Sequence, residues 1–115
     1  MREPSRDLSR LEHILSAIEY VESYTNGISE ELLKENKLYL HATTYNVQII
    51  GEAVYKLSTE FKQQHPLTPW AVIEKMRHIL VHDYFKINLD VLWEVIKKDI
   101  PVLKAQVEQY ITEIR

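Results

Sequence analysis

The segment from Thr68 to Tyr84 reads TPWAVIEKMRHILVHDY, and its pattern predicts a helix. Thr68 is a residue type that caps helix N-termini, and Pro69 suits the first helical position. We expect the helix to start near Pro69 and to end between His82 and Phe85. Its apolar residues recur every three to four positions, which predicts a single buried face. They are Val72, Ile73, Met76, Ile79 and Leu80.

Helical periodicity also dominates the rest of the chain. We expect helices over about residues 7–26, 36–57 and 89–98 and a short helical turn capped by Ser29. Residues 99–101 are expected to kink the chain or restart it into a last helix. Gly27 is placed to end the first helix, and Asn88 to cap the helix from Leu89. These elements predict an all-α antiparallel bundle of four to five helices. The residues expected inside it are Leu8, Leu11, Ile14, Leu15, Ile18, Val21, Leu40, Val47, Ile50, Val54, Leu57, Trp70 and Trp93. The last helix is expected to run through Val102, Leu103, Val107, Tyr110 and Ile111.

Length and composition limit the class of protein. A chain of 115 residues with 45% hydrophobic residues and two glycines predicts one helical domain over residues 1–115. The absence of cysteine excludes disulfides and thiolate catalysis. No apolar run approaches a membrane span, and the N-terminus lacks an apolar signal core, so we expect a cytoplasmic protein that makes no membrane contact. A net charge of −3 argues against binding nucleic acid through bulk electrostatics.

The end of the quoted segment gathers the groups that RNA cleavage without a metal requires. The attacking 2'-hydroxyl must lose a proton, the leaving 5'-oxygen must gain one, and the charged phosphorus oxygens need a fixed cation. His78 and His82 are suited to the proton transfers, and Arg77 to the cation. On an ideal helix, however, Arg77 and His82 lie about 140° apart. The site therefore needs either a distorted helix end or a second protomer, and we expect a homodimer.

The chain resembles the HepT-like family of HEPN domains. The resemblance rests on segments 49–53, 69–70, 76–77, 80–85 and 89–93, and on the spacing of Arg77, four residues, His82, one residue and Tyr84. It covers nearly the whole chain. The chain departs from the family pattern at His78, where relatives often carry Asn, and at Tyr45, where an Arg commonly precedes Asn46.

The resemblance implies a metal-independent endoribonuclease that acts as the toxin of a toxin–antitoxin pair. In such proteins the Arg and His lie in a cleft between two protomers. The implied partner is a minimal nucleotidyltransferase antitoxin, which transfers AMP from ATP to the motif tyrosine, here Tyr84. The expected roles are catalytic for Arg77 and His82 and supporting for His78 and Asp83, with no metal and no cofactor.

Other interpretations of the same residues stay open. Arg77 can pair with Glu74 or Asp83 in a purely structural role. Glu74, His78 and His82 have the spacing of metal ligands on a helix, although such a set is more often a solvated face. Glu52 can orient Arg77 across the bundle. We expect Trp70 and Trp93 to anchor the core, and His13, His41 and His65 to be surface or satisfied core residues.

The leading hypothesis is an endoribonuclease that leaves a 2',3'-cyclic phosphate and is neutralised by AMP transfer to Tyr84. The chief alternative is a non-catalytic helper subunit that binds a nucleotide or substrate for a nucleotidyltransferase. The acidic charge balance favours this alternative. A purely structural dimerisation bundle is the third possibility, for which the polar motif has no evident use.

Overall fold

The computed structural model describes the backbone of residues 4–81 and 89–115 and the side chains of residues 6–75 and 89–115. All regular structure in these ranges is helical. The elements are α1 (Pro4–Thr25), α2 (Glu30–Glu35), α3 (Lys37–Lys56), α4 (Thr59–Gln64), α5 (Trp70–Val81), α6 (Leu89–Glu94), the π-helical turn η1 (Val95–Asp99) and α7 (Ile100–Ile114). The predicted all-α class is therefore confirmed for the described residues.

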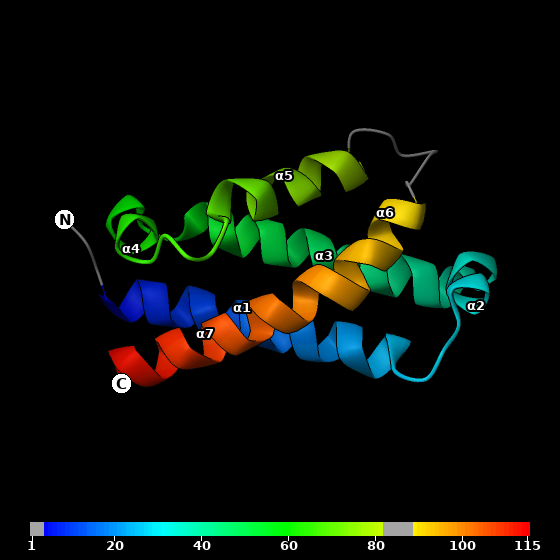
Figure 1. The fold of residues 1–115 in the computed structure, drawn as a ribbon, viewed down its shortest axis with the longest axis horizontal. Helices are drawn as coiled ribbons and strands as arrows, with labels where there is room; N and C mark the ends of the chain where they lie inside the picture. Colours follow the sequence, from blue (N-terminus) through cyan, green and yellow to red (C-terminus); the bar gives the residue numbers. More distant parts are fainter. Residues whose placement is uncertain (1–3, 82–88) are drawn as a thin grey trace.

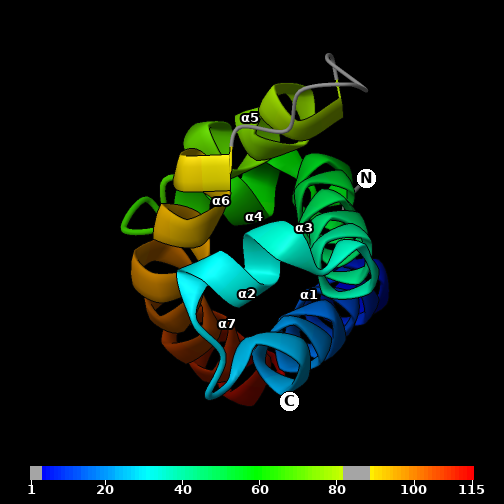
Figure 2. The ribbon, with the colours of Figure 1, turned by 90° about the vertical axis from the view of Figure 1, so that its right-hand side faces the viewer.

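The long helical segments run in alternating directions (Figure 1). α3 packs against both α1 and α5, and α7 packs against α1. α2 lies across one end of the bundle, where it contributes the buried Leu33 to the core (Figure 2). The described ranges contain no helix with the length and apolar character needed to cross a membrane. The number of helices in the predicted bundle, the single domain and the homodimer stay predictions.

The first three predicted elements are confirmed, because their boundary signals are local. Gly27 adopts a φ of 79°, a left-handed conformation that glycine reaches without strain and that ends α1. The Ser29 side chain accepts a hydrogen bond from the Leu32 amide at 3.0 Å and so caps α2. Asn36 caps α3 in the same way, by accepting from the Tyr39 amide at 3.2 Å.

The predicted core is largely confirmed. Leu11, Ile14, Ile18 and Val21 of α1 are fully buried, as are Val47, Ile50 and Val54 of α3, whereas Leu8 and Leu15 are only partly buried. The prediction is wrong for Val72, whose exposed fraction is 59%. Val72 directly precedes the buried Ile73 and so lies about 100° away from it around the helix, beside the buried stripe rather than within it. Periodicity finds the centre of a buried stripe more reliably than its width.

No helix is predicted between residues 57 and 69, yet α4 (Thr59–Gln64) forms there. The Ser58 side chain accepts from the Phe61 amide at 3.1 Å, and the buried Asp7 carboxylate accepts from the Ser58 amide at 2.9 Å and from its hydroxyl at 2.8 Å. Phe61 is fully buried. A six-residue helix is too short to show a period, and its supporting carboxylate lies 51 residues away in sequence, so local signals miss it.

The restart expected at residues 99–101 is confirmed, because α7 begins at Ile100 and Pro101 lies in its first turn. Asp99 and Ile100 both keep right-handed helical backbone angles, and the chain continues through η1 into α7. Within η1 the Ile100 amide bonds to the Val95 carbonyl, a wider turn than that of an α-helix. Proline at position 101 has no amide hydrogen to donate and normally clashes with the carbonyl four residues earlier. The wider turn directly before it accommodates this, so the helix continues.

Candidate functional site

The candidate motif begins on α5, which carries the backbone of Arg77 and His78. The side chains of these two residues lie outside the described residues, and so do His82, Asp83 and Tyr84 entirely. The roles expected for all five therefore stay predictions. What the structure establishes is how the elements on either side of the motif are held.

The start of α5 is held by an aromatic cluster. Trp70 is 7% exposed, and its indole Nε1 donates to the His65 carbonyl at 2.9 Å. Its ring lies 5.9 Å from that of Phe61 and 5.9 Å from that of Tyr110, between centroids. Thr68, buried just before the helix, shares a 2.6 Å hydrogen bond with the Tyr110 hydroxyl. α5 therefore begins at a fixed position against α4 and α7, and Trp70 is confirmed as a core anchor.

One turn further along, α5 is tied to α4 by an ion pair. Lys62 Nζ lies 2.8 Å from Glu74 Oε1, and both side chains are mostly buried. The same ammonium group donates to the Val54 carbonyl at 3.3 Å, at the end of α3. Glu74 thus has a cationic partner other than Arg77. This weakens the structural interpretation of Arg77 as the partner of Glu74, because Lys62 already neutralises that carboxylate.

On the far side of the motif, α6 is tied to α2. Lys34 Nζ lies 2.8 Å from Asp90 Oδ1 and 2.8 Å from Glu30 Oε2. The hydrogen bond from Lys34 lowers the pKa of Asp90, and the same bond raises the pKa of Lys34. Leu92 is fully buried and fixes α6 in the core. The described helices on both sides of the motif are therefore anchored independently.

A band of buried polar residues on α3 was not found by the sequence analysis. Thr43, Thr44 and Asn46 are 0%, 6% and 7% exposed. The Asn46 amide donates to the Ala42 carbonyl at 2.9 Å, whereas the buried hydroxyls of Thr43 and Thr44 have no hydrogen-bond partner among the residues whose side chains are described. Burying an unpaired hydroxyl costs stability. Their inward positions, in register with Val47 and Ile50, are the signal in the sequence that marks this band.

Three other residues with expected roles differ in how far they are exposed to solvent. Tyr45, at the position where the chain departs from the family pattern, is 63% exposed and so lies at the surface. Glu52 is also exposed, and its expected role in orienting Arg77 stays a prediction. Trp93 is only partly buried, with Lys97 Nζ 4.7 Å from its ring centroid, so it anchors the core less fully than expected.

The three other histidines behave as expected. His13 and His41 are exposed. His65 is a satisfied, half-buried residue, because its ring stacks on Phe61 at 4.2 Å between centroids and its Nδ1 lies 2.9 Å from the Phe61 carbonyl. In the part of the chain with described side chains, no group of three or more His, Asp or Glu residues could hold a metal ion. Two members of the alternative metal set, His78 and His82, fall outside that part.

Comparison with known proteins assigns the chain to a family. Residues 14–110 match the family model described as "Ribonuclease HepT-like". A protein of Caldanaerobacter subterraneus subsp. tengcongensis, named "Putative RNase", is 40% identical over 99 residues, which are 86% of this chain and 88% of that protein. A protein of Thermococcus cleftensis, named "Probable ribonuclease HepT", is 39% identical over 99 residues, which are 86% of this chain and 90% of that protein.

A longer relative comes from Methanocaldococcus jannaschii and is named "Gamma-glutamylcyclotransferase and putative RNase". It is 38% identical over 104 residues, and the chain spans about half of its length, since these residues are 90% of this chain and 47% of that protein. No solved structure matches the chain.

Proposed function

The chain belongs to the HepT-like ribonuclease family, so its enzymatic class is that of an endoribonuclease, and we propose that Arg77 and His82 carry the reaction. The observation that supports this assignment most strongly is the extent of the family match. It runs over residues 14–110 and therefore includes every position of the motif. We further propose that the protein acts in the cytoplasm and needs no metal ion or other cofactor.

The proposed reaction is an internal displacement at phosphorus. The 2'-oxygen of the RNA forms a bond to phosphorus as its proton leaves, and the bond to the 5'-oxygen breaks as that oxygen gains a proton. His82 exchanges these protons, and Arg77 stabilises the negative charge on the phosphorus oxygens. His78 and Asp83 support the two. The products are a 2',3'-cyclic phosphate and a free 5'-hydroxyl.

The anchoring of α5 supports the role of Arg77. A guanidinium stabilises a transition state most effectively when the helix that carries it is already in position. Moving the helix during the reaction would cost part of the stabilisation free energy. Trp70 and the Lys62–Glu74 pair hold the helix at its start and one turn further along. Because Lys62 already neutralises Glu74, the Arg77 guanidinium faces less competition from that carboxylate for an RNA phosphate.

We propose that the active form is a homodimer with one motif from each protomer at a shared cleft. The supporting argument is the helical angle of about 140° between Arg77 and His82, which prevents one straight helix from directing both at the same phosphate. A second protomer supplies the missing group without distorting the helix.

We propose further that a nucleotidyltransferase antitoxin neutralises the protein by transferring AMP to Tyr84. The Tyr84 oxygen attacks the α-phosphorus of ATP, the phenol loses its proton, and pyrophosphate leaves. The new phosphodiester places a negative charge close in sequence to Arg77, where it competes with the RNA phosphate. RNA is the substrate in this account, and the antitoxin is the second protein partner.

The alternative function is a helper subunit that binds a nucleotide or substrate for the nucleotidyltransferase and cleaves nothing. The net charge of −3 favours it, because nucleases that track RNA along its backbone are commonly basic.

Growth during induced expression separates the two functions. Wild-type protein should arrest growth, whereas Arg77→Ala and His82→Ala should not, with Lys75→Ala as an exposed control on the same helix. Arrest by wild type and Lys75→Ala alone supports the nuclease. Unaffected growth with all four proteins, expressed to equal levels and folded, would support the helper subunit.

A further inference from the structure

An apolar groove runs between the start of α5 and one face of α7. It consists of two neighbouring hollows of about 120 Å³ and 410 Å³, which share Gln106 in their linings. The described lining residues come from the end of α4, the loop into α5, the first turn of α5, and α7 with the residue before it. None of them belongs to the motif, so the groove is separate from the site of the proposed reaction.

The walls of the groove carry apolar side chains that are open to solvent. Leu67 in the loop, Val72 on α5 and Val102 on α7 are 86%, 59% and 57% exposed. They flank the core residues Ile73 and Leu103, which also line the groove. Removal of such side chains from water is the main favourable contribution to most protein–protein association. The groove therefore offers exposed apolar surface to a partner.

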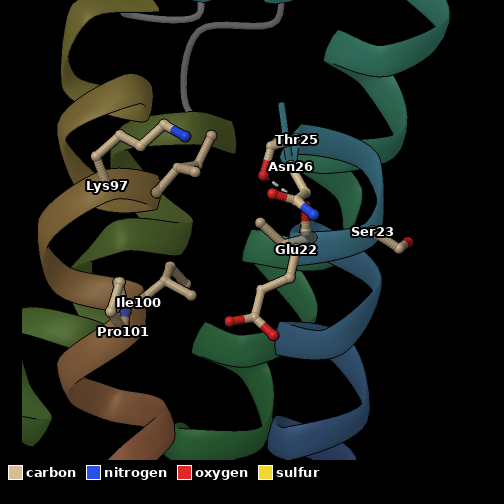
Figure 3. Close-up of a pocket in the computed structure, with 9 residues that line it drawn as sticks. Glu22, Ser23, Thr25, Asn26, Lys97, Ile100 and Pro101 are labelled. Carbon is tan, nitrogen blue, oxygen red and sulfur yellow. Dashed lines mark hydrogen bonds between the residues drawn. The ribbon is translucent and has the colours of Figure 1, made fainter. Parts of the chain in front are cut away.

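A second cleft, between the end of α1 and η1, lacks such a surface (Figure 3). Its aliphatic lining residues Val21, Ile96 and Ile100 are buried. Its charged lining residues, Glu22 and Lys97, extend from opposite walls and have opposite signs (Figure 3). The groove between α5 and α7 is thus the better site for an apolar contact.

The fixed charges along the groove are acidic. Apart from His65, the charged residues of its described lining are Asp99 and Glu113. Asp99 directly precedes α7 and Glu113 lies in its last turn, so the two are about 21 Å apart along the helix axis. The Asp99 side chain does not cap α7, and the adjacent Lys98 is paired with Glu94 at 2.8 Å. One end of the groove therefore presents an available carboxylate.

Glu113 provides the carboxylate at the other end. Its Oε2 accepts from Gln109 Nε2 at 3.1 Å, and its Oε1 lies 3.6 Å from His65 Nε2. The His65 Nδ1 lies 2.9 Å from the Phe61 carbonyl, so it carries the hydrogen of the neutral ring. Nε2 then has no hydrogen to donate, and a neutral His65 leaves the charge of Glu113 uncompensated. Both ends of the groove therefore attract cations.

We propose that this groove binds an amphipathic helix of a protein partner, whose apolar stripe has lysine or arginine at both ends. In this mode of recognition, side chains three to four residues apart on the bound helix pack into an apolar groove. The stripe packs against Leu67, Val72 and Val102, and the terminal cations pair with Asp99 and Glu113. A helix of roughly 14 residues, at about 1.5 Å per residue, spans the distance between the two carboxylates.

The charges disfavour a second copy of this chain as the occupant. If two copies met through this groove with their α7 helices antiparallel, Asp99 of each copy would face Glu113 of the other. With the helices parallel, each carboxylate would face its own counterpart. Like charges across an interface oppose association. The homodimer proposed above is built around the motif, and the inference for this groove does not depend on the proposed cleavage.

Fluorescence anisotropy with two labelled peptides tests the proposal. Both are amphipathic helices of roughly 14 residues with the same leucine stripe on a background of alanine and glutamine. One carries lysines at both ends, and the other carries glutamates there. The lysine peptide should bind the wild-type protein about tenfold more tightly than the glutamate peptide, and the difference should shrink as the salt concentration rises.

Variants of the apolar walls test where the peptide binds. Val72→Gln and Val102→Gln replace exposed apolar surface with a polar amide, and each should weaken binding of the lysine peptide by about fivefold. Ala71→Gln is the matched control, because Ala71 is exposed on α5 but does not line the groove, and it should leave binding unchanged. Thermal unfolding checks that all variants keep the fold.

Variants of the carboxylates test the role of charge. Asp99→Asn combined with Glu113→Gln should remove the preference for the lysine peptide. Glu108→Gln, at an exposed position of α7 outside the groove lining, should preserve it.

Failure of the lysine peptide to bind, equal binding of the two peptides by wild type, or equal losses in Val72→Gln and Ala71→Gln would overturn the proposal. Sedimentation in which Val102→Gln converts a wild-type dimer into a monomer would also overturn it, because that result identifies a second copy as the occupant. None of these results touches the nuclease, whose own test uses Arg77 and His82.

Discussion

Lys62 Nζ and Glu74 Oε1 lie 2.8 Å apart and join α4 to α5, the helix that carries Arg77. The same Lys62 group donates to the Val54 carbonyl at 3.3 Å and thereby holds the end of α3 as well. One ammonium group therefore ties three helices together. It also fixes how α5 rests against the bundle one turn before the motif arginine.

Replacing Lys62 tests this link. Lys62→Met keeps the apolar stem and removes the charge, which leaves a half-buried Glu74 without its cation. We expect a loss of about 1–2 kcal/mol in the free energy of unfolding. Urea denaturation measures it, with the exposed Lys56→Met as the control. A loss no larger than that of the control would show that the ion pair does not hold α5.

The hydrogen bonds of Asp7 predict a second stability effect. Asp7 is 2% exposed and accepts from both the amide and the hydroxyl of Ser58, at the N-terminus of α4. Asp7→Ala leaves both donors of Ser58 without this acceptor, and we expect a loss of about 2–3 kcal/mol. Ser58→Ala removes the hydroxyl alone and should cost less. Equal costs in chemical denaturation would contradict the dual role of the carboxylate.

The buried hydroxyls of α3 predict a gain in stability on replacement. Thr43→Val removes a fully buried hydroxyl that has no hydrogen-bond partner among the described side chains, and it keeps the shape of the side chain. We expect the free energy of unfolding to increase by up to about 1 kcal/mol. Thr25→Val is the matched control, because the equally buried Thr25 hydroxyl donates to Val21 at 2.7 Å and its loss should not stabilise. A clear destabilisation by Thr43→Val would mean that this hydroxyl has a partner in solution.

The ion pair between Lys34 and Asp90 predicts a dependence of stability on pH. Lys34 lowers the pKa of Asp90 in the folded state, so folding favours the ionised carboxylate. The contribution is fully present above the ordinary Asp pKa of about 3.9 and is lost as the pH falls through the lower folded value. The pair is exposed, so the effect is small and decreases with salt.

Thermal unfolding of wild type and Asp90→Asn between acidic and neutral pH measures this effect. The difference between their midpoints should be largest near neutral pH and should vanish at strongly acidic pH. If the difference in midpoint between wild type and Asp90→Asn grew as the pH fell, the ion pair would not be stabilised by the ionised Asp90 carboxylate, and the prediction would be wrong.

The sequence predicts the parts of the fold whose signals are local. Gly27, Ser29 and Asn36 mark helix ends through their own backbone or side chains, and the stripes of α1 and α3 are long enough to show a period. α4 and the π-helical turn η1 were missed for the opposite reason. α4 depends on Asp7, far away in sequence, and η1 is a change in helical pitch that no residue type specifies.

For the candidate site, residue types and spacing were sufficient to select Arg77, His82 and Tyr84 as a set. They were not sufficient to find the surroundings of that set. The partner of Glu74 comes from α4, a helix absent from the prediction. The polar band at Thr43 and Asn46 was overlooked because polar residue types are normally expected at the surface, although its register with the buried stripe of α3 marks it.

Cleavage of a defined tRNA pool by purified protein in excess chelator tests the central claim most directly. Wild type is run beside Arg77→Ala and His82→Ala, with Lys62→Met as a variant outside the motif, and the RNA ends are assayed for 2',3'-cyclic phosphate. The account predicts cyclic ends from wild type, reduced or equal amounts from Lys62→Met, and none from the two motif variants. No cleavage by a folded, unmodified wild-type dimer, or equal cleavage by Arg77→Ala and His82→Ala, would contradict it.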